Sequence, residues 1–276
     1  EFGSWLEALC RQMGNDDAGD LVNRYRKLND CGSWLIFREY FEHPNHPIKL
    51  AKARFCQQPL WCTFCAARRS IKCCRSARNK VMGFLEQRRR LRLFPYMLTI
   101  TSRDNDNLTE MCDEQFAAWS RWLERRRNYK KSIETKSSRP RAWCELSAIA
   151  GGIMSWEVKR GSGSKQWHLH AHGVVMAPFV KDMDDHKERY ANLVREWSDC
   201  LGYEANLDFR YIKNGLDKGL LEVFKYALKA NELEHADHLH AAIALGRRRL
   251  VRGWGDLYGF KEPRDYADDL TGLENE

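Results

Sequence analysis

The sequence predicts an α+β fold in which helices flank a central, mostly antiparallel sheet. Runs typical of strands alternate with helical runs in the order strand, helix, two strands, helix, strand, helix. A Gly-Ser turn at residues 161–164 joins the two consecutive strands into a hairpin. With 276 residues the chain is also long enough to bury a sizeable core beneath such a sheet.

Residues 5–92 are expected to form an N-terminal segment that is helical, rich in cysteine and basic. We interpret residues 1–4 as a cloning remnant and exclude them from the fold. Residues 34–37 suit a strand or a helix, and the prolines within residues 43–47 require a loop. A basic helix over residues 66–92 follows, and Pro95 is expected to end it.

Residues 93–233 are expected to form the core domain, followed by a helical and basic tail at residues 234–276. A strand at 96–101 opens the core, and a helix carrying Phe116 and Trp119 follows it. The remaining expected elements are a charged loop at 130–141, strands at 151–159 and 167–176, a helix at 182–201, a strand at 207–212 and a helix at 217–233.

Three histidines alternate along the strand at residues 167–176. The period of two places His168, His170 and His172 on one face, where neighbouring imidazoles lie roughly 6 to 7 Å apart. Two of them can therefore hold one divalent cation, although such a cluster can also be an exposed polar face that only forms hydrogen bonds. Glu157 of the hairpin partner strand is either a third, carboxylate ligand or a surface glutamate.

The chain contains ten cysteines, and clustered cysteines in a reducing compartment indicate metal ligands rather than disulfides. Cys62 and Cys65 form a Cys-x-x-Cys knuckle with Cys56 just upstream, which predicts three ligands of a zinc ion. The fourth ligand is open among these residues: Cys31, His43, His46, Cys73 and Cys74. The alternative is that the thiols are buried separately as small apolar groups.

A net charge of +8 and a pI near 9.0 favour a polyanionic partner. Arginine runs supply candidate DNA contacts at Arg88, Arg89, Arg247 and Arg248, although each run by itself also suits a solvated helix face. Ten tryptophans and ten tyrosines could supply stacking platforms for bases. No signal peptide or apolar run of ~20 residues is seen, so a cytoplasmic protein without a membrane partner is expected.

The last core helix carries two polar residues one turn apart. Glu222 and Tyr226 share a face flanked by Lys225 and Lys229, while Leu221, Phe224 and Leu228 form an apolar stripe. Most tyrosines at such positions are packing residues.

Three segments together resemble the three motifs of HUH endonucleases. They are Leu98-Thr99-Ile100-Thr101, then Trp167-His168-Leu169-His170-Ala171-His172-Gly173-Val174-Val175, then Glu222-Val223-Phe224-Lys225-Tyr226. More narrowly, they resemble the rolling-circle replication initiators of small bacterial plasmids, in which a glutamate precedes the nucleophilic tyrosine by four residues. The cysteines, with Arg68 and Arg69, are similar to a segment that precedes the first motif in that group, and these two arginines are further candidate DNA contacts. The resemblance covers roughly residues 50 to 260.

The resemblance implies an HUH endonuclease fold and site- and strand-specific DNA nicking and joining. Tyr226 would form a 5′-phosphotyrosine, Lys225 and Lys229 would hold the phosphodiester, and Glu222 would activate water for termination. His170 and His172 match the metal-binding pair, which would hold Mg²⁺ or Mn²⁺. His168 is then an extra histidine that joins the metal or touches DNA.

The implied partners are the plasmid origin, with its nick site as a single strand or hairpin, and a bacterial host helicase and DNA polymerase. The chain would act as a monomer or dimer in the bacterial cytoplasm. The alternatives are another HUH enzyme (a single-tyrosine transposase or a relaxase), a non-enzymatic zinc-dependent DNA-binding protein, and a metal-dependent hydrolase without a covalent step.

Overall fold

The computed structural model describes residues 2–12, 19–41, 48–139, 141–213, 215–224, 233–246 and 248–261. The predicted loop at residues 43–47 lies outside these ranges. The helices are α1 (Phe2–Gln12), α2 (Gly19–Asn29), α3 (Thr63–Gln87), α4 (Leu108–Glu134), α5 (Met183–Leu201), α6 (Leu216–Val223) and α7 (His235–Leu245). The strands are β1 (Leu35–Glu39), β2 (Ile48–Ala53), β3 (Leu93–Thr101), β4 (Gly151–Arg160), β5 (Trp167–Pro178), β6 (Leu207–Tyr211) and β7 (Val251–Gly255).

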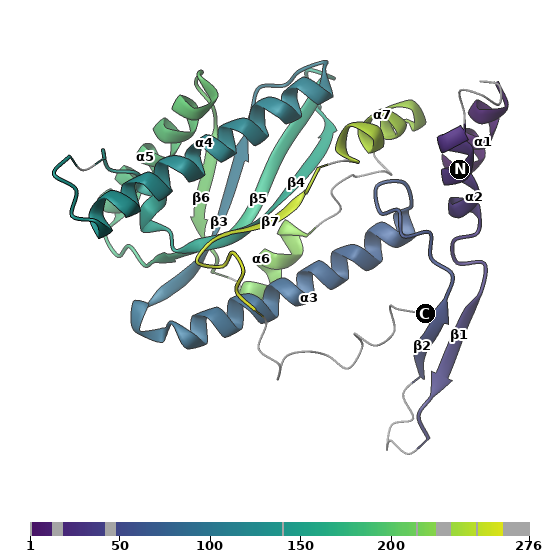
Figure 1. Ribbon diagram of the computed structural model, residues 1–276, viewed down its shortest axis with the longest axis horizontal. Coiled ribbons are helices and arrows are strands. Elements are labelled where there is room, and N and C mark those ends of the chain that lie inside the picture. The colour runs from purple at the N-terminus through teal and green to yellow at the C-terminus, as the bar shows by residue number, and fades with distance from the viewer. Residues whose placement is uncertain are drawn as a thin grey trace.

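A five-stranded sheet forms the centre of the molecule, in the order β6-β3-β5-β4-β7. All four pairings are antiparallel, and β4 and β5 form the predicted hairpin. Helices α4 and α5 cover one face of this sheet, and α3 and α6 cover the other (Figure 1). The prediction of an α+β fold with a largely antiparallel sheet is confirmed.

Alternate residues of β5 pack into two separate cores. Leu169, Ala171 and Val175 face α4 and α5, whereas Val174 and Met176 face α3 and α6. The histidines share the parity of Val174, so their side chains lie on the side of the sheet that α3 and α6 cover.

Two predicted boundaries were wrong. Helix α3 ends at Gln87, and Pro95 lies inside β3, where its carbonyl accepts a hydrogen bond from the Ile212 backbone N–H at 3.1 Å. The turn is made instead at Arg92, whose left-handed backbone (φ 47°) follows a short 3₁₀ helix. The expected charged loop at 130–141 begins later because α4 continues to Glu134.

Arg126 of α4 is buried among polar partners. Its guanidinium donates hydrogen bonds to the carbonyls of Ile149 (3.2 Å) and Ala150 (2.7 Å) and lies 3.7 Å from Asp256. Burial lowers the pKa of Arg126, and the charge of Asp256 opposes that shift. Arg126 is therefore a structural residue that joins α4 to the segment before β4 and to Asp256.

Strand β7 comes from the segment expected to be a tail, but it pairs with β4 and completes the sheet. Gly255 at its end needs to be glycine, because its φ is +61° and a Cβ there would lie 2.4 Å from the Ala150 carbonyl oxygen. The folded sheet thus extends past the expected boundary at residue 233.

Helix α6 turns a different face inward from the predicted stripe. Leu220, Val223 and Phe224 are buried against Val174 and Met176, whereas Leu221 is 62% exposed. The prediction that Phe224 faces the core is confirmed, and the same prediction for Leu221 was wrong. Leu228 lies outside the described residues.

Helices α1 and α7 meet at the buried side chain of His238. Its Nε2 lies 2.8 Å from the Leu60 carbonyl, and the ring of Phe2 stacks on it at 4.0 Å. Phe2 thus packs on the fold although residues 1–4 were expected to stand apart from it.

Burial lowers the pKa of His238, so folding favours the neutral form of its imidazole. In the unfolded chain the same imidazole binds a proton as the pH falls below about 6.5. We therefore expect the free energy of unfolding to decrease as the pH falls through that value, and His238→Gln to reduce this dependence. Denaturant unfolding over a pH series measures it, with His240→Gln on the exposed side of α7 as the control. An equal pH dependence in both variants would contradict the assignment.

Candidate metal centre and active site

Strands β4 and β5 bring Glu157, His170 and His172 together. The register pairs Glu157 with His170 and Ser155 with His172, and paired residues of an antiparallel sheet point to the same side. One ligand atom from each of the three side chains lies within 4.8 Å of the others. Glu157 and His170 are buried and His172 is half-buried, so the group is accessible from the side of His172.

The distances suit a divalent metal better than an ordinary hydrogen bond. His170 Nε2 lies 3.6 Å from Glu157 Oε2, which is too long for a good hydrogen bond. Two atoms bound to one ion at about 2.1 to 2.2 Å stand roughly 3.0 to 3.6 Å apart. Two imidazoles and a carboxylate also leave coordination positions open for a substrate. The Glu/His/His group could therefore hold a divalent ion.

Thr99 of the first predicted motif supports His172 from the neighbouring strand. Its hydroxyl lies 2.9 Å from His172 Nδ1. When Nδ1–H donates this bond, the Nε2 lone pair remains for a metal, which is how outer residues commonly orient histidine ligands.

His168 is held by another partner. Its Nδ1 lies 2.7 Å from Asp104 Oδ1, and Ser164 donates to the same carboxylate at 2.5 Å. Burial alone would raise the pKa of Asp104, but the hydrogen bonds from Ser164 and His168 outweigh it and lower that pKa. The structure places His170 and His172 together with Glu157, whereas His168 forms a hydrogen bond with Asp104.

A small hollow lies beside the metal group. Ser155 of β4, in register with His172, lines it together with Arg69 and Ser70 of α3 and with Phe224. The Ser70 hydroxyl donates a hydrogen bond to the carbonyl of Phe224. This bond ties the end of α6 to α3 at the edge of the hollow, and we call this space the α3 hollow.

The third predicted motif is described only in part. Glu222 is half-buried in the last turn of α6. Lys225, Tyr226 and Lys229 lie outside the described residues.

Two other tyrosines can be compared with the metal group. Tyr211 packs its ring against Tyr96, Phe94 and Phe179, on the α5 side of the sheet. Tyr190, on α5, donates its hydroxyl to the Leu207 carbonyl at 3.0 Å. Both therefore lie across the sheet from His170 and His172.

Four cysteines form a second cluster at the start of α3. Cys31, Cys56, Cys62 and Cys65 each place a sulfur within 4.8 Å of the others. Three of the sulfur–sulfur distances are 3.4, 3.6 and 3.6 Å. A tetrahedral ion with bonds of about 2.3 Å sets its sulfurs about 3.8 Å apart. The cluster could hold a metal ion, and Cys31 takes the fourth position that the sequence left open.

Backbone N–H groups also point at these sulfurs. The Cys65 N–H donates to Cys62 Sγ at 3.5 Å, and the Cys56 N–H donates to Cys31 Sγ at 3.4 Å. Burial is the main cause that raises the pKa of the Cys56 thiol. Because a metal binds thiolates, the affinity of the cluster is expected to rise with pH.

The predicted arginine contacts are spread over the molecule. Arg69 borders the α3 hollow, and the Arg68 guanidinium lies 3.6 Å from the ring centre of Phe55, near the cysteines. Arg88 and Arg89 are exposed at the far end of α3, where Arg89 pairs with Glu86 at 3.2 Å. Arg248 pairs with Asp113 of α4 at 2.8 Å, and Arg247 lies outside the described residues.

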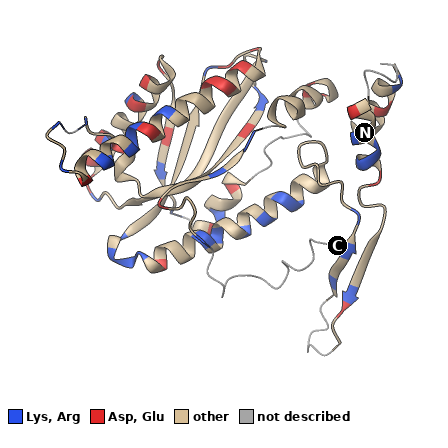
Figure 2. Ribbon diagram, viewed as in Figure 1, with Lys and Arg blue, Asp and Glu red and all other residues tan. Residues whose placement is uncertain are grey.

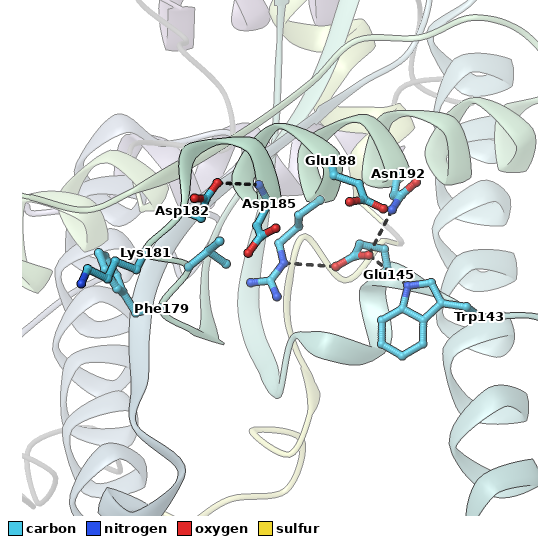
Figure 3. A pocket seen from close by; sticks show the side chains of 10 residues that line it. Trp143, Glu145, Phe179, Lys181, Asp182, Asp185, Glu188 and Asn192 are labelled. Carbon is cyan, nitrogen blue, oxygen red and sulfur yellow. Dashed lines mark hydrogen bonds and ion pairs between the residues drawn. The ribbon is translucent and has the colours of Figure 1, made fainter.

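A separate hollow opens at the start of α5, between Trp143, Phe179 and Asp185 (Figure 3). Its polar groups bind one another, since Glu145 accepts hydrogen bonds from Arg189 at 3.1 Å and Trp143 at 3.0 Å. It belongs to the α5 layer, across the sheet from the metal group.

Sequence reasoning did not single out Thr99, Asp104 or Ser70 as supporting residues. Thr99 stands inside a quoted motif, but its partnership with His172 depends on strand register. Ser70 follows the Arg68-Arg69 pair of the resembling segment, but its partner is 154 residues away, and Asp104 carried no local signal because its partner is 64 residues away.

Comparison of the chain with protein family models, curated proteins and solved structures gives no match. Within the described ranges, none of the helices is both long and apolar enough to cross a membrane.

Proposed function

We propose that the chain is an HUH-type endonuclease that initiates plasmid rolling-circle replication by nicking and rejoining one DNA strand. The observation that carries the proposal is the Glu157, His170 and His172 group, set beside the hollow to which Ser70 anchors the end of α6. The order of the three sequence motifs supports the same reading, and the antiparallel sheet is compatible with an HUH fold.

The proposed chemistry requires a nucleophile two residues beyond Phe224. The Tyr226 oxygen attacks the scissile phosphorus, a Tyr–O–P bond forms, and the P–O3′ bond breaks as the 3′ oxygen takes up a proton. The DNA then carries a 5′-phosphotyrosine and a free 3′ hydroxyl that a host polymerase can extend. Lys225, Lys229 and Arg69 hold the phosphate in this scheme.

Glu157, His170 and His172 would hold Mg²⁺ or Mn²⁺. When bound, the ion would offset negative charge on the phosphate oxygens in the transition state. Thr99 fixes the His172 ring, and burial of Glu157 and His170 keeps water from competing with their side chains.

Termination needs a second nucleophile, because Tyr226 is already bound to DNA. In this proposal Glu222, four residues before Tyr226 in the sequence, accepts a proton from water, and that water cleaves the regenerated junction. The phosphodiester energy kept in the tyrosine ester allows rejoining without a nucleotide cofactor. A host helicase would unwind the duplex behind the nick.

We assign zinc to the four-cysteine cluster, because four thiolates in a tetrahedral arrangement prefer it. Cys31→Ser is expected to abolish stoichiometric zinc binding, whereas Cys73→Ser, also on a half-buried thiol, should keep it. A metal present at 1,000 times its Kd stabilises a fold by about 4.1 kcal/mol, so the first variant should also unfold at lower denaturant concentration. Zinc content by mass spectrometry and a denaturant titration measure both effects. Equal zinc content in the two variants would argue for another fourth ligand.

The deciding experiment incubates the full chain with Mn²⁺ and labelled single-stranded DNA tiled across its plasmid origin. We expect an SDS-resistant protein–DNA adduct, with the nucleotide mapped to the Tyr226 peptide by mass spectrometry. Nicking without an adduct would indicate a hydrolase, and binding without nicking would leave a DNA-binding protein.

A further inference from the structure

The two-stranded ribbon of β1 and β2 extends away from the body of the molecule (Figure 1). All five residues of β1 are exposed, in contrast to the buried strands of the main sheet. Nothing in the nicking chemistry proposed above uses this ribbon.

The ribbon has two unlike faces. The pairs Ile36 with Lys52 and Arg38 with Lys49 point to one side, and Lys49 also lies 5.4 Å from the ring of Tyr40. The pairs Phe37 with Leu50 and Glu39 with Ile48 point to the other side. The first face carries Arg38, Lys49 and Lys52, all exposed, and Figure 2 shows blue on both strands. We call it the basic face.

The four-cysteine cluster ties the base of this ribbon to α3. Cys31 lies before β1, Cys56 follows β2, and Cys62 and Cys65 begin α3. Arg54 adds an ion pair with Asp30 at 2.8 Å at the same end. A ribbon held at its base is oriented relative to the rest of the molecule.

Helix α3 connects this base to the active site. Ser70, at the α3 hollow, comes five residues after Cys65, a rise of about 8 Å along the helix. The ribbon strands themselves extend about 17 Å. A DNA segment continuous with the nick site would therefore pass within reach of the basic face.

We propose that the ribbon is an arm that binds duplex DNA flanking the nick site through its basic face, with its direction set by the cysteine cluster. A major groove about 12 Å wide admits a two-stranded β-ribbon. Arginine, lysine and tyrosine suit phosphates and base edges. The proposal rests on the proposed nicking function for the position of the DNA, and it assigns to the ribbon a contact that phosphate binding at the nick does not provide.

The test compares a triple variant, Arg38→Ala with Lys49→Ala and Lys52→Ala, with a control of equal charge change on the α4 side, Arg127→Ala with Lys131→Ala and Arg139→Ala. The probe is a labelled duplex of about two helical turns, with the same strand unpaired as a second probe. Fluorescence anisotropy gives Kd over a salt series. Each lost phosphate contact lowers the salt slope by about 0.9.

We expect the ribbon variant to bind the duplex about tenfold or more weakly, and its salt slope to decrease by about 2 to 3. The control variant should show smaller changes in both Kd and salt slope. Unpaired DNA should be affected less than duplex. Unchanged zinc content shows that the variant is folded. Duplex binding equal to that of the wild type would overturn the proposal, and loss of a dimer in sedimentation without loss of DNA binding would instead assign the ribbon to a second copy.

This outcome is separable from that of the nicking proposal. If the wild type forms no tyrosine adduct but the ribbon variant loses duplex affinity, the proposal that the ribbon binds duplex DNA is supported and the nicking proposal is wrong. If the adduct forms and duplex binding is unchanged in the ribbon variant, the nicking proposal is supported and the proposal that the ribbon binds duplex DNA is wrong.

Discussion

Tyr226→Phe is expected to abolish the covalent protein–DNA adduct and to lower the nicking rate by on the order of 10³ or more. The substitution removes one oxygen, which is the atom that would bond to phosphorus, and keeps the aromatic ring. Neither Tyr211 nor Tyr190 can replace it, because both lie on the other side of the sheet. The measurement is single-turnover cleavage of end-labelled origin DNA, resolved on a denaturing gel.

Tyr211→Phe is the matched control, since it also removes one hydroxyl from a tyrosine near the sheet. It should nick at nearly the wild-type rate. Glu222→Ala should still form the adduct but release it slowly, because the first transfer uses Tyr226 and only the second uses water. If Tyr226→Phe nicked as fast as Tyr211→Phe, the covalent scheme would be wrong.

The second large effect is expected at the metal group. His170→Ala should weaken Mn²⁺ binding by at least 100-fold, since even residues that only orient a ligand change metal affinity 10- to 100-fold. It removes a buried ligand from the Glu157, His170 and His172 group, which does not include His168. Titration calorimetry with Mn²⁺ measures the affinity, and the nicking rate at saturating metal measures the consequence.

His168→Ala is the control, since it removes an imidazole from the same face of the same strand, two residues away. Its Mn²⁺ affinity should remain within a few-fold of the wild type. Thr99→Val should lie between the two variants, because it removes the hydrogen-bond partner of His172 Nδ1 but no ligand. An equal loss of affinity in His168→Ala and His170→Ala would show that three histidines, rather than two with Glu157, hold the ion.

The sequence by itself determined the order of the core elements, the hairpin of β4 and β5, and the face on which the histidines lie. These features depend on local periods of 2 and 3.6 residues and on turn residues, which neighbours in the chain supply. It also identified Glu157 as a candidate ligand, because the length of the hairpin turn constrains which residues can be opposite.

Only the tertiary structure decided between alternatives that depend on distant residues. Cys31 was one of five candidates for the fourth position. The return of the ribbon to α3 places Cys31, rather than Cys73 or Cys74, beside the other three cysteines, and His43 and His46 lie outside the described residues. His168 lies outside the metal group and is hydrogen-bonded to Asp104, a residue 64 positions away. Strand β7 pairs with the edge of β4 that the hairpin with β5 leaves open. In each case the deciding contact joins residues that are far apart in the sequence. Local propensity and residue spacing do not determine which distant residues come into contact.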